Sequence, residues 1–375
     1  MSSRAALALA TLGACGREPV EIPAIRFLHT FAPEESELLD TITTERKLAV
    51  ESSRVPFARG QQVIGEILRA GRDCPDLIRI DATWLPGMAE LLAPAPDALA
   101  RLDWTPEAQA MIKVGPATLA VPHTVDGLVV IRDRSRPAPA TPAIADLIAA
   151  ARAARTQATP YPLAVRVDAY WFLPWLRADG GELAVTGIEG DGATRALAGF
   201  ASLVGEIVPP PPPAGSEAPS ELRRWQTREL AYWVTGPWQL GALRDRDQVA
   251  ITALAHAPRG GQLLVVPKCA TRPGEGWRLA SELTEVAVEH RFADAFGTVP
   301  TRVAALTTAA PLARAVYEAL RSAEPLPQTP HTPLLFDDLN PALAAVVAHD
   351  ATPEEAVEGV RRGWKRLVRS QDGPP

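Results

Sequence analysis

The chain has 375 residues, a formal net charge of −6, and 47% hydrophobic and 22% charged residues. This length is enough for two domains of ordinary size, and no apolar run in the body of the chain is long enough to span a bilayer. The basic residues are scattered rather than gathered in a stripe, which argues against a nucleic-acid-binding protein.

The first segment has the pattern of an export signal. Arg4 precedes a short apolar stretch, Ala5 to Ala14, with small residues ahead of Cys15. The sequence Leu12-Gly13-Ala14-Cys15 resembles a bacterial lipobox, in which cleavage leaves the cysteine as a lipidated N-terminus. Lipidation of Cys15 would tether a soluble body to a membrane surface without a spanning helix. The alternative is a chance Ala/Leu-rich terminus of a cytoplasmic protein.

Strands and helices alternate through the first third of the chain. Branched and aromatic residues predict the strands, and apolar residues at helical spacing predict the helices, the second of which ends at Gly71. This alternation, with short loops, predicts an α/β fold with a parallel sheet covered on both faces. The expected elements are a strand at 25–31, a helix from Pro33, a strand at 47–52, a helix at 59–70 and a strand at 77–80.

The strand at 77–80 is followed directly by Asp81, Thr83 and Trp84. In an open α/β sheet, ligands bind at the carboxyl ends of the strands. A carboxylate accepts hydrogen bonds from adjacent hydroxyls, and an indole stacks on the apolar face of a sugar ring, so this group fits a polyhydroxylated ligand. The alternative is structural: Trp84 lies in the core, and Asp81 caps a helix running from Met88 to Leu92.

Further elements follow along the chain. The segment 118–131 predicts two apolar strands around a polar bend that contains Pro122, and 209–219 is a low-complexity loop. The stretch from Leu230 to Leu240 predicts a strand, a Gly-Pro turn and a helix that starts near Trp238. The other expected helices are an Ala-rich one at 143–155, an aromatic one at 170–176, a long one at 277–290, and one at 352–368 with a capping box at Thr352 and Glu355.

Several of these stretches, in this order, resemble the carbohydrate-binding proteins of ABC importers, of the maltose/trehalose-binding type. They are the stretch after residue 80, the bend near Asp126, the aromatic helix with Gly180-Gly181-Glu182, the Gly236-Pro237-Trp238 segment, and Gly297-x-x-Pro300-x-Arg302. The resemblance implies a two-lobed periplasmic-binding-protein type II fold, with a hinge and a ligand cleft between the lobes. It implies an N-terminal lobe of 20–121 plus 262–305 and a C-terminal lobe of 122–261 plus 306–375, after a signal, lipobox and linker at 1–19.

The resemblance also implies which residues meet the ligand. Structural alternatives stay open for some of them: Glu35 complementing a helix dipole, Asp126 forming a turn, and Arg302 forming a surface ion pair. Trp175 and Trp233 are expected in the core. His123 and Thr124 stand where the family often has aromatic residues. The expected ligand-binding residues are His29, Phe31, Glu35, Asp81, Trp84, Asp126, Tyr170, Trp171, Gly236, Trp238 and Arg302.

Family topology would place the strands beside Cys74 and Cys269 in the same lobe. A disulfide between them is one hypothesis, and two separate buried thiols are the other.

We therefore expect a periplasmic or cell-surface, lipid-anchored monomer that captures a di- or oligosaccharide and delivers it to the transmembrane subunits of an ABC permease. No nucleotide-binding, zinc-binding or hydrolase motif is present, so the sequence predicts no cofactor, no metal and no enzymatic activity. The alternatives are a binding protein for a non-sugar solute and a lipoprotein that senses a ligand. A more remote one is a glycoside hydrolase that uses Asp81 and Asp126.

Overall fold

The computed structural model describes residues 23–184, 187–211 and 220–371. The expected export signal with Cys15, and most of the low-complexity loop, lie outside the described residues. No helix in the described part is both long and apolar enough to cross a membrane.

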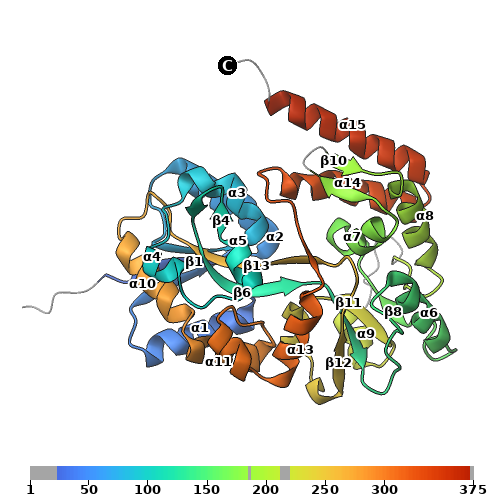
Figure 1. The fold of residues 1–375 in the computed structure, drawn as a ribbon, viewed down its shortest axis with the longest axis horizontal. Coiled ribbons are helices and arrows are strands. Elements are labelled where there is room, and N and C mark those ends of the chain that lie inside the picture. Colours follow the sequence, from blue (N-terminus) through green and yellow to red (C-terminus); the bar gives the residue numbers. More distant parts are fainter. Residues whose placement is uncertain (1–22, 185–186, 212–219, 372–375) are drawn as a thin grey trace, which may run out of the picture.

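Two separate sheets organise the described chain (Figure 1). The six-stranded sheet, with the helices packed on it, is called the first lobe here. Its strand order is β14-β13-β3-β1-β2, and β6 pairs with the free side of β13. Its strands are β1 (Ile25–His29), β2 (Val50–Arg54), β3 (Leu77–Asp81), β6 (Val121–Gly127), β13 (Pro258–Val265) and β14 (Glu324–Pro325).

The parallel part of this sheet arises from the first alternating elements. β1 pairs in parallel with β2 and β3, as expected for strands joined by helical crossovers. The second crossover helix ends where Gly71 takes a left-handed conformation (φ 65°), which glycine adopts without steric cost. The main helices of the lobe are α1 (Pro33–Glu45), α2 (Phe57–Ala70), α10 (Pro273–Leu283) and α11 (Val286–Phe296).

Short elements complete the first lobe after β3. They are η1 (Ala82–Trp84), α3 (Leu85–Met88), η2 (Ala89–Leu91), α4 (Asp97–Ala100), α5 (Pro106–Met111), β4 (Lys113–Val114) and β5 (Ala117–Thr118).

The second lobe is built on the four-stranded sheet, in the order β12-β7-β11-β8. Its strands are β7 (Val129–Asp133), β8 (Leu163–Ala164), β11 (Tyr232–Thr235) and β12 (Val249–Thr252). A small hairpin of β9 (Glu182–Ala184) and β10 (Gly187–Glu189) packs against α15. The helices of this part are α6 (Ile144–Ala154), α7 (Ala169–Ala178), α8 (Ala193–Leu203), α9 (Glu221–Gln226), η3 (Pro237–Ala242), η4 (Arg246–Gln248), α13 (Pro311–Leu320), α14 (Thr332–Val347) and α15 (Pro353–Gln371).

The capping box expected at the start of the last helix is confirmed. The Thr352 N–H donates to Glu355 Oε2 at 2.9 Å, and the Glu355 N–H donates to Thr352 Oγ1 at 3.2 Å. The two side chains thus satisfy backbone donors that the first turn of α15 leaves free.

The chain passes between the two sheets more than once. β6 of the first sheet runs almost directly into β7 of the second, and the chain returns between β12 and β13. It leaves the first lobe again after α11, because the short α12 (Val303–Thr308) leads to α13, which packs on β7 and β12. Three connections at the border between two bodies are the arrangement on which hinge motion depends.

The expectation of a bend at Pro122 is wrong, since Pro122 lies inside strand β6. The register explains how the strand tolerates a residue without an N–H. Thr124 pairs with Gln262 and Pro122 pairs with Leu263, so β6 bulges by one residue, at His123, between them. A bulge is one of the few places where a sheet accommodates proline.

The expectation of one long helix at 277–290 is also wrong, because the structure divides it into α10 and α11 at Thr284. The Thr284 hydroxyl donates to the Ala280 carbonyl, and the helix restarts at Val286. The two parts pack on different partners, α10 on β1 and β3 and α11 on α1 and η3. Tertiary packing therefore overrides the continuous helical periodicity.

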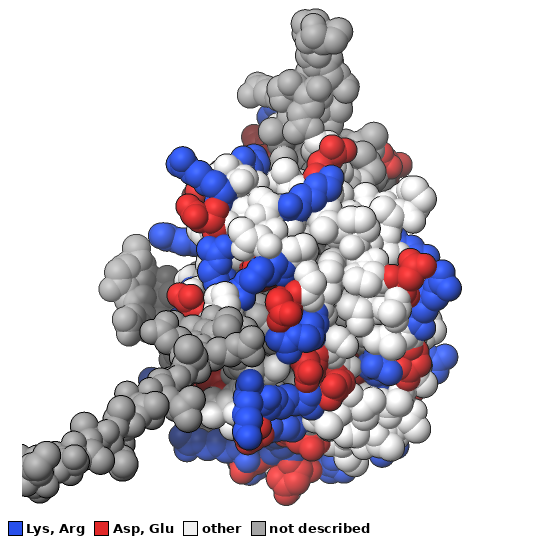
Figure 2. Space-filling view, turned by 90° about the vertical axis from the view of Figure 1, so that its left-hand side faces the viewer, with Lys and Arg blue, Asp and Glu red and all other residues white. Residues whose placement is uncertain are grey.

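The first lobe is cross-linked. Cys74, before β3, and Cys269, after β13, form a disulfide with their Cα atoms 5.8 Å apart. This confirms the pairing hypothesis and rules out two free thiols in this structure. Figure 2 views this lobe from its outer side, where Lys and Arg are interspersed with Asp and Glu and form no patch of one sign. Such a surface does not favour nucleic-acid binding.

Candidate functional site

Asp81 ends strand β3 with its carboxylate fixed on both oxygens. Oδ1 accepts from the Thr83 N–H at 2.9 Å and the Thr83 hydroxyl at 2.6 Å, while Oδ2 accepts from Gln262 Nε2 at 3.0 Å. The carboxylate therefore caps the short η1, rather than a helix over Met88–Leu92. Burial raises the pKa of Asp81, although Thr83 and Gln262 lower it.

Gln262 was not identified from the sequence. It lies on β13 between two strands, in register with Asp81 of β3 on one side and with Thr124 of β6 on the other. Its side chain is buried, and its Oε1 has no hydrogen-bond partner in the part of the chain that the structure describes. Such a buried acceptor is costly to leave unpaired, so it is open to a ligand or water donor.

Asp126 on β6 is the second carboxyl group of this edge. Burial raises its pKa to about 7, and the neighbouring charge of Asp81 adds to the shift, while Arg79 and a hydrogen bond from Gln262 oppose it. The structure thus brings together Asp81 and Asp126, two of the residues expected from the sequence, with Gln262 between them.

Arg79 supplies positive charge beneath these carboxyl groups. It lies two residues before Asp81 on the same face of β3, and only 5% of it is exposed. Its Nη1 donates to Thr30 Oγ1 at 3.2 Å, its Nε donates to His123 Nδ1 at 3.4 Å, and its guanidinium lies 4.3 Å from the centre of the Phe31 ring. Burial, together with Arg79, lowers the pKa of His123 well below its usual value, so this histidine is a neutral acceptor.

His29 and Phe31, both expected to bind ligand, are buried beneath this edge. Only 1% of each is exposed, and their rings lie 5.0 Å apart. Phe31 also stacks on Phe292 at 5.5 Å. Burial lowers the pKa of His29 to about 4, so the ring is neutral at pH 7.

The second lobe contributes aromatic rings. The rings of Tyr170 and Trp171, on α7, are 5.5 Å apart, and Trp171 lies 6.1 Å from Trp238 of η3. Phe336 of α14 was missed by the sequence reasoning, and its ring lies 6.2 Å from that of Tyr170. Helical spacing alone could not link Phe336 to α7, because the two segments meet only in the folded lobe.

Two contacts orient these rings. Trp171 Nε1 donates to the Val234 carbonyl at 3.1 Å, and the Arg166 guanidinium lies 4.8 Å from the centre of the Trp171 ring. Trp238 folds back over Gly236, where a Cβ would collide with the indole, so glycine is needed there for close approach. Trp238 remains 40% exposed, whereas Trp175 and Trp233 are buried, as expected.

The carboxyl groups and the aromatic rings face one another across the two lobes. Burial raises the pKa of Tyr170 well above its usual value, and the negative charges of Asp126 and Asp81 add to this effect. The lobes also touch nearby, because α14 packs against η1 and a Cβ at Gly87 would lie 3.7 Å from the Pro330 carbonyl oxygen.

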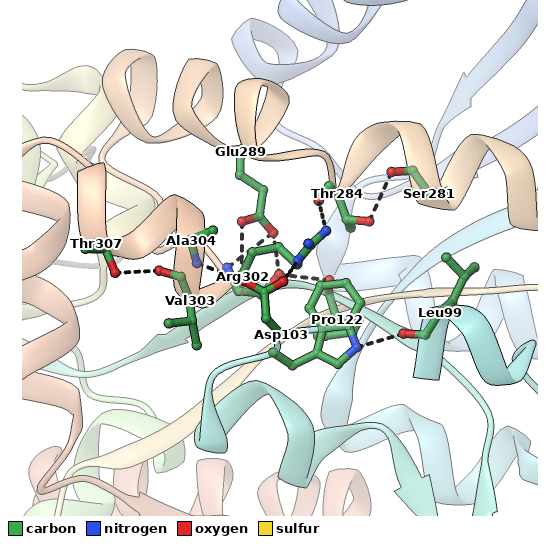
Figure 3. Close-up of polar contacts among 12 residues, drawn as sticks. Leu99, Asp103, Pro122, Ser281, Thr284, Glu289, Arg302, Val303, Ala304 and Thr307 are labelled. Carbon is green, nitrogen blue, oxygen red and sulfur yellow. Dashed lines mark hydrogen bonds and ion pairs between the residues drawn. The ribbon is translucent and has the colours of Figure 1, made fainter. Parts of the chain in front are cut away.

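Three other expected residues have different surroundings. Trp84 is 6% exposed and packs against Phe57, and the Glu35 carboxylate accepts from the Ala32 N–H at 2.8 Å while adding negative charge near Asp126. Arg302 forms an ion pair with Asp103 and donates to the Thr284 carbonyl at 3.5 Å (Figure 3). These contacts do not include the carboxyl groups or aromatic rings described above.

Figure 3 also shows a buried carboxyl group that the sequence did not reveal. Glu289 of α11 accepts from the Thr301 hydroxyl and from the N–H groups of Thr301 and Arg302, and the Thr301 hydroxyl also contacts the Pro122 carbonyl at 3.1 Å. Burial raises its pKa to about 7. Glu289 thus fastens the segment after α11 to strand β6, where the chain passes between lobes.

Among the residues that the structure describes, no group of three or more His, Cys, Asp or Glu side chains could hold a metal ion. The chemistry of the cluster is that of hydrogen bonding and ring stacking: acceptors and an arginine from one side, aromatic rings from the other.

Comparison with known proteins gives matches of structure only. No protein-family model and no curated protein sequence matches the chain. The GacH receptor of Streptomyces glaucescens, solved unliganded and with acarbose, superposes with a TM-score of 0.80 at 21% identity, covering 93% of this chain and 99% of that one. Maltose-bound T. maritima MalE3 gives 0.80 at 19% identity, covering 92% and 100%.

The ABC substrate-binding protein Lmo0181 from Listeria monocytogenes, in complex with cycloalternan, gives a TM-score of 0.79 at 16% identity, covering 92% of this chain and 99% of that one. These likenesses cover nearly the whole described chain and confirm the expected fold. The chain has the two-lobed α/β fold of the periplasmic sugar-binding proteins.

Proposed function

We propose that this protein is the extracytoplasmic substrate-binding component of an ABC importer. It binds a di- or oligosaccharide between its lobes and delivers it to the transmembrane subunits of a permease. The mechanism is recognition and release: a ligand that contacts both lobes stabilises the closed arrangement over the open one.

The observation that carries this proposal is the opposition of Asp81 and Asp126 of the first lobe to Tyr170 of the second. Carboxylates accept hydrogen bonds from paired hydroxyls, and aromatic rings cover the apolar C–H face of a sugar. A neutral polyhydroxylated ring needs both kinds of contact, because it has polar edges and weakly polar faces.

The structural neighbours agree with this chemistry. Similar folds have been solved with maltose, maltotriose and acarbose bound. By this analogy the sugar-facing residues are Asp81, Asp126, Tyr170, Trp171, Gly236 and Trp238, while His29, Phe31 and Glu35 support them from beneath, and Trp84 and Arg302 lie at the margins.

The proposal includes a lipid anchor at Cys15 and a monomeric body outside the cytoplasmic membrane. The support is the export-signal pattern ahead of Cys15 and the fold of the body. In bacterial cells, the wild-type protein should fractionate with membranes and the Cys15→Ser variant should be soluble. Equal partition of the two forms would contradict the anchor.

Thermal unfolding in a panel of mono-, di- and oligosaccharides tests the binding function. A ligand that binds only the folded state stabilises it by about 2.7 kcal/mol at a concentration of one hundred times Kd. We expect at least one sugar, tested at millimolar concentration, to raise Tm by several degrees. No shift with any sugar would favour a non-sugar solute or a ligand-sensing role.

The same samples test the absence of bond chemistry. Two carboxyl groups, one with a raised pKa, are the minimum that a glycoside hydrolase needs. If the protein only binds, chromatography after prolonged incubation will return the added oligosaccharide intact. Cleavage lost in both Asp81→Asn and Asp126→Asn would instead establish a hydrolase.

A further inference from the structure

The first lobe also carries an exposed aromatic ring at this site. Phe57 is 52% exposed, whereas the neighbouring Trp84 is only 6% exposed. Large exposed apolar side chains are uncommon on this molecule: in the described part of the chain they are Phe57, Trp238 and Val303. Trp238 already belongs to the aromatic group of the second lobe, so Phe57 is its counterpart on the first.

The first turn of α2 explains why Phe57 is exposed and Trp84 is not. Phe57 and Gly60 are three residues apart and share one face of the helix. A Cβ at Gly60 would lie 2.6 Å from Trp84 Cη2, so the indole fits against the helix only because residue 60 has no side chain. The Phe57 ring then covers the indole, with ring centres 5.2 Å apart and planes inclined by 35°.

This pair lies beside the candidate ligand site. Trp84 ends η1, the short helix that Asp81 caps, and α14 of the second lobe packs against η1. In Figure 1, α2 lies on the side of the first lobe that is turned toward the second. Phe57 also follows β2, at the same edge of the sheet as Asp81, because β1, β2 and β3 are parallel.

We propose that Phe57 is a ligand-contacting residue of the first lobe and that Trp84 positions it from behind. The ligand then has aromatic surface on both sides, Phe57 on one lobe and Trp238 on the other, with the carboxyl groups between them. This inference rests on the proposed carbohydrate-binding function and makes it narrower: the favoured ligands offer apolar ring faces toward both lobes.

Calorimetric titration of the full chain without its lipid anchor (Cys15→Ser) tests the inference, with maltose, maltotriose and acarbose as probes. For each probe that this form binds, Phe57→Ala should weaken binding about tenfold, the usual scale of one lost aromatic contact. Phe57→Trp should retain affinity within a factor of about three, because it restores a ring. The matched control is Val303→Ala, also an exposed apolar side chain (45%), which should bind as the parent does.

Trp84→Leu separates contact from positioning. If Trp84 acts through Phe57, adding Phe57→Ala to Trp84→Leu should cause little further loss, whereas two independent contacts would give multiplied losses. Parent-like binding by Phe57→Ala would overturn the inference while leaving the proposed function intact. Failure of the parent form to bind any of the three probes, or any other sugar of the panel above, would overturn both.

Discussion

The two lobes contribute different chemistry to the candidate site. The first lobe offers polar groups fixed by a sheet: Asp81, Asp126 and Gln262 stand on three adjacent strands, with Arg79 beneath them. The second offers aromatic rings at the ends of helices and turns, such as Tyr170 on α7 and Trp238 on η3. A backbone ladder sets the spacing of the polar groups, while the rings depend on local packing.

This difference indicates a division of labour. The hydrogen-bonding half is ordered before a ligand arrives, so little entropy is lost when hydroxyl groups bind to it. The aromatic half belongs to another body, joined to the first by connections at β6–β7, β12–β13 and after α11. The comparison therefore predicts that the first lobe governs specificity and that the second governs closure. Four perturbations test it.

The largest expected effect is on the stability of the first lobe. The Cys74–Cys269 disulfide closes a sequence separation of 195 residues, and no disulfide is found in the described part of the second lobe. In the chain-entropy model, reduction of so long a loop costs about 4 kcal/mol. Urea unfolding of a Cys15→Ser form with and without reductant measures this loss. Identical curves, with two free thiols by titration, would contradict the cross-link.

The second effect concerns pH and the connection between lobes. A carboxyl group whose pKa is higher in the folded state than in the unfolded state binds its proton more tightly when folded. Its contribution to stability is therefore full at low pH and is lost as pH rises through the folded pKa, here between about 4.5 and 7 for Glu289. A shift of this size corresponds to about 3 kcal/mol.

We expect the free energy of unfolding to fall by about 3 kcal/mol less in Glu289→Gln than in the wild type between pH 4.5 and pH 8. Urea titrations at the two pH values measure this difference. Glu275→Gln, in a surface ion pair with Arg278, is the matched control and should follow the wild type. An unchanged slope in Glu289→Gln would show that Glu289 is not the titrating group.

The third effect is on affinity through the first lobe. Asp81→Ala removes an acceptor whose two oxygens hold Thr83 and Gln262, leaving the buried amide without its partner. Losing a charge-assisted hydrogen bond and its supports should weaken sugar binding about a hundredfold. Titration calorimetry gives the ratio. A loss below threefold would mean that the sheet edge does not contact the ligand.

The smallest effect is on the second lobe. Trp238→Ala should weaken binding about tenfold and change the free energy of unfolding by less than about 1 kcal/mol, because the indole is 40% exposed. Trp175→Phe, on buried α7 packing, should do the opposite, leaving affinity unchanged while lowering stability by about 1–2 kcal/mol. If Trp238→Ala unfolds the protein instead, the ring is a structural element.

The sequence predicts the fold through local signals that the tertiary structure preserves. The strand before Asp81, the Gly-Pro-Trp segment and the capping box at Thr352 all occur where expected, because turn and cap chemistry acts within a few residues. Errors arise where distant partners decide. Pro122 stays in β6 because of a bulge against β13, and the helix at 277–290 breaks at Thr284 because its halves pack on different elements.

The site follows the same pattern. Asp81 and Asp126 follow recognisable strands, so their types and positions point to the site. Gln262 lies 181 residues from Asp81 in sequence, and only strand pairing brings them together. Phe57 became visible only from its exposure, although its spacing from Gly60 is a weak local signal for an aromatic ring packed on the helix. Long-range register carries this information, and no local pattern encodes it.

The most direct test of the central claim is a calorimetric titration of maltose, maltotriose and acarbose into the anchor-free wild type, Asp81→Ala and Trp238→Ala. The account predicts that at least one of these sugars binds the wild type and that both variants, one from each lobe, bind it more weakly. Binding that depends on one lobe alone, or no heat from any sugar with a folded protein, would contradict a carbohydrate site shared between the lobes.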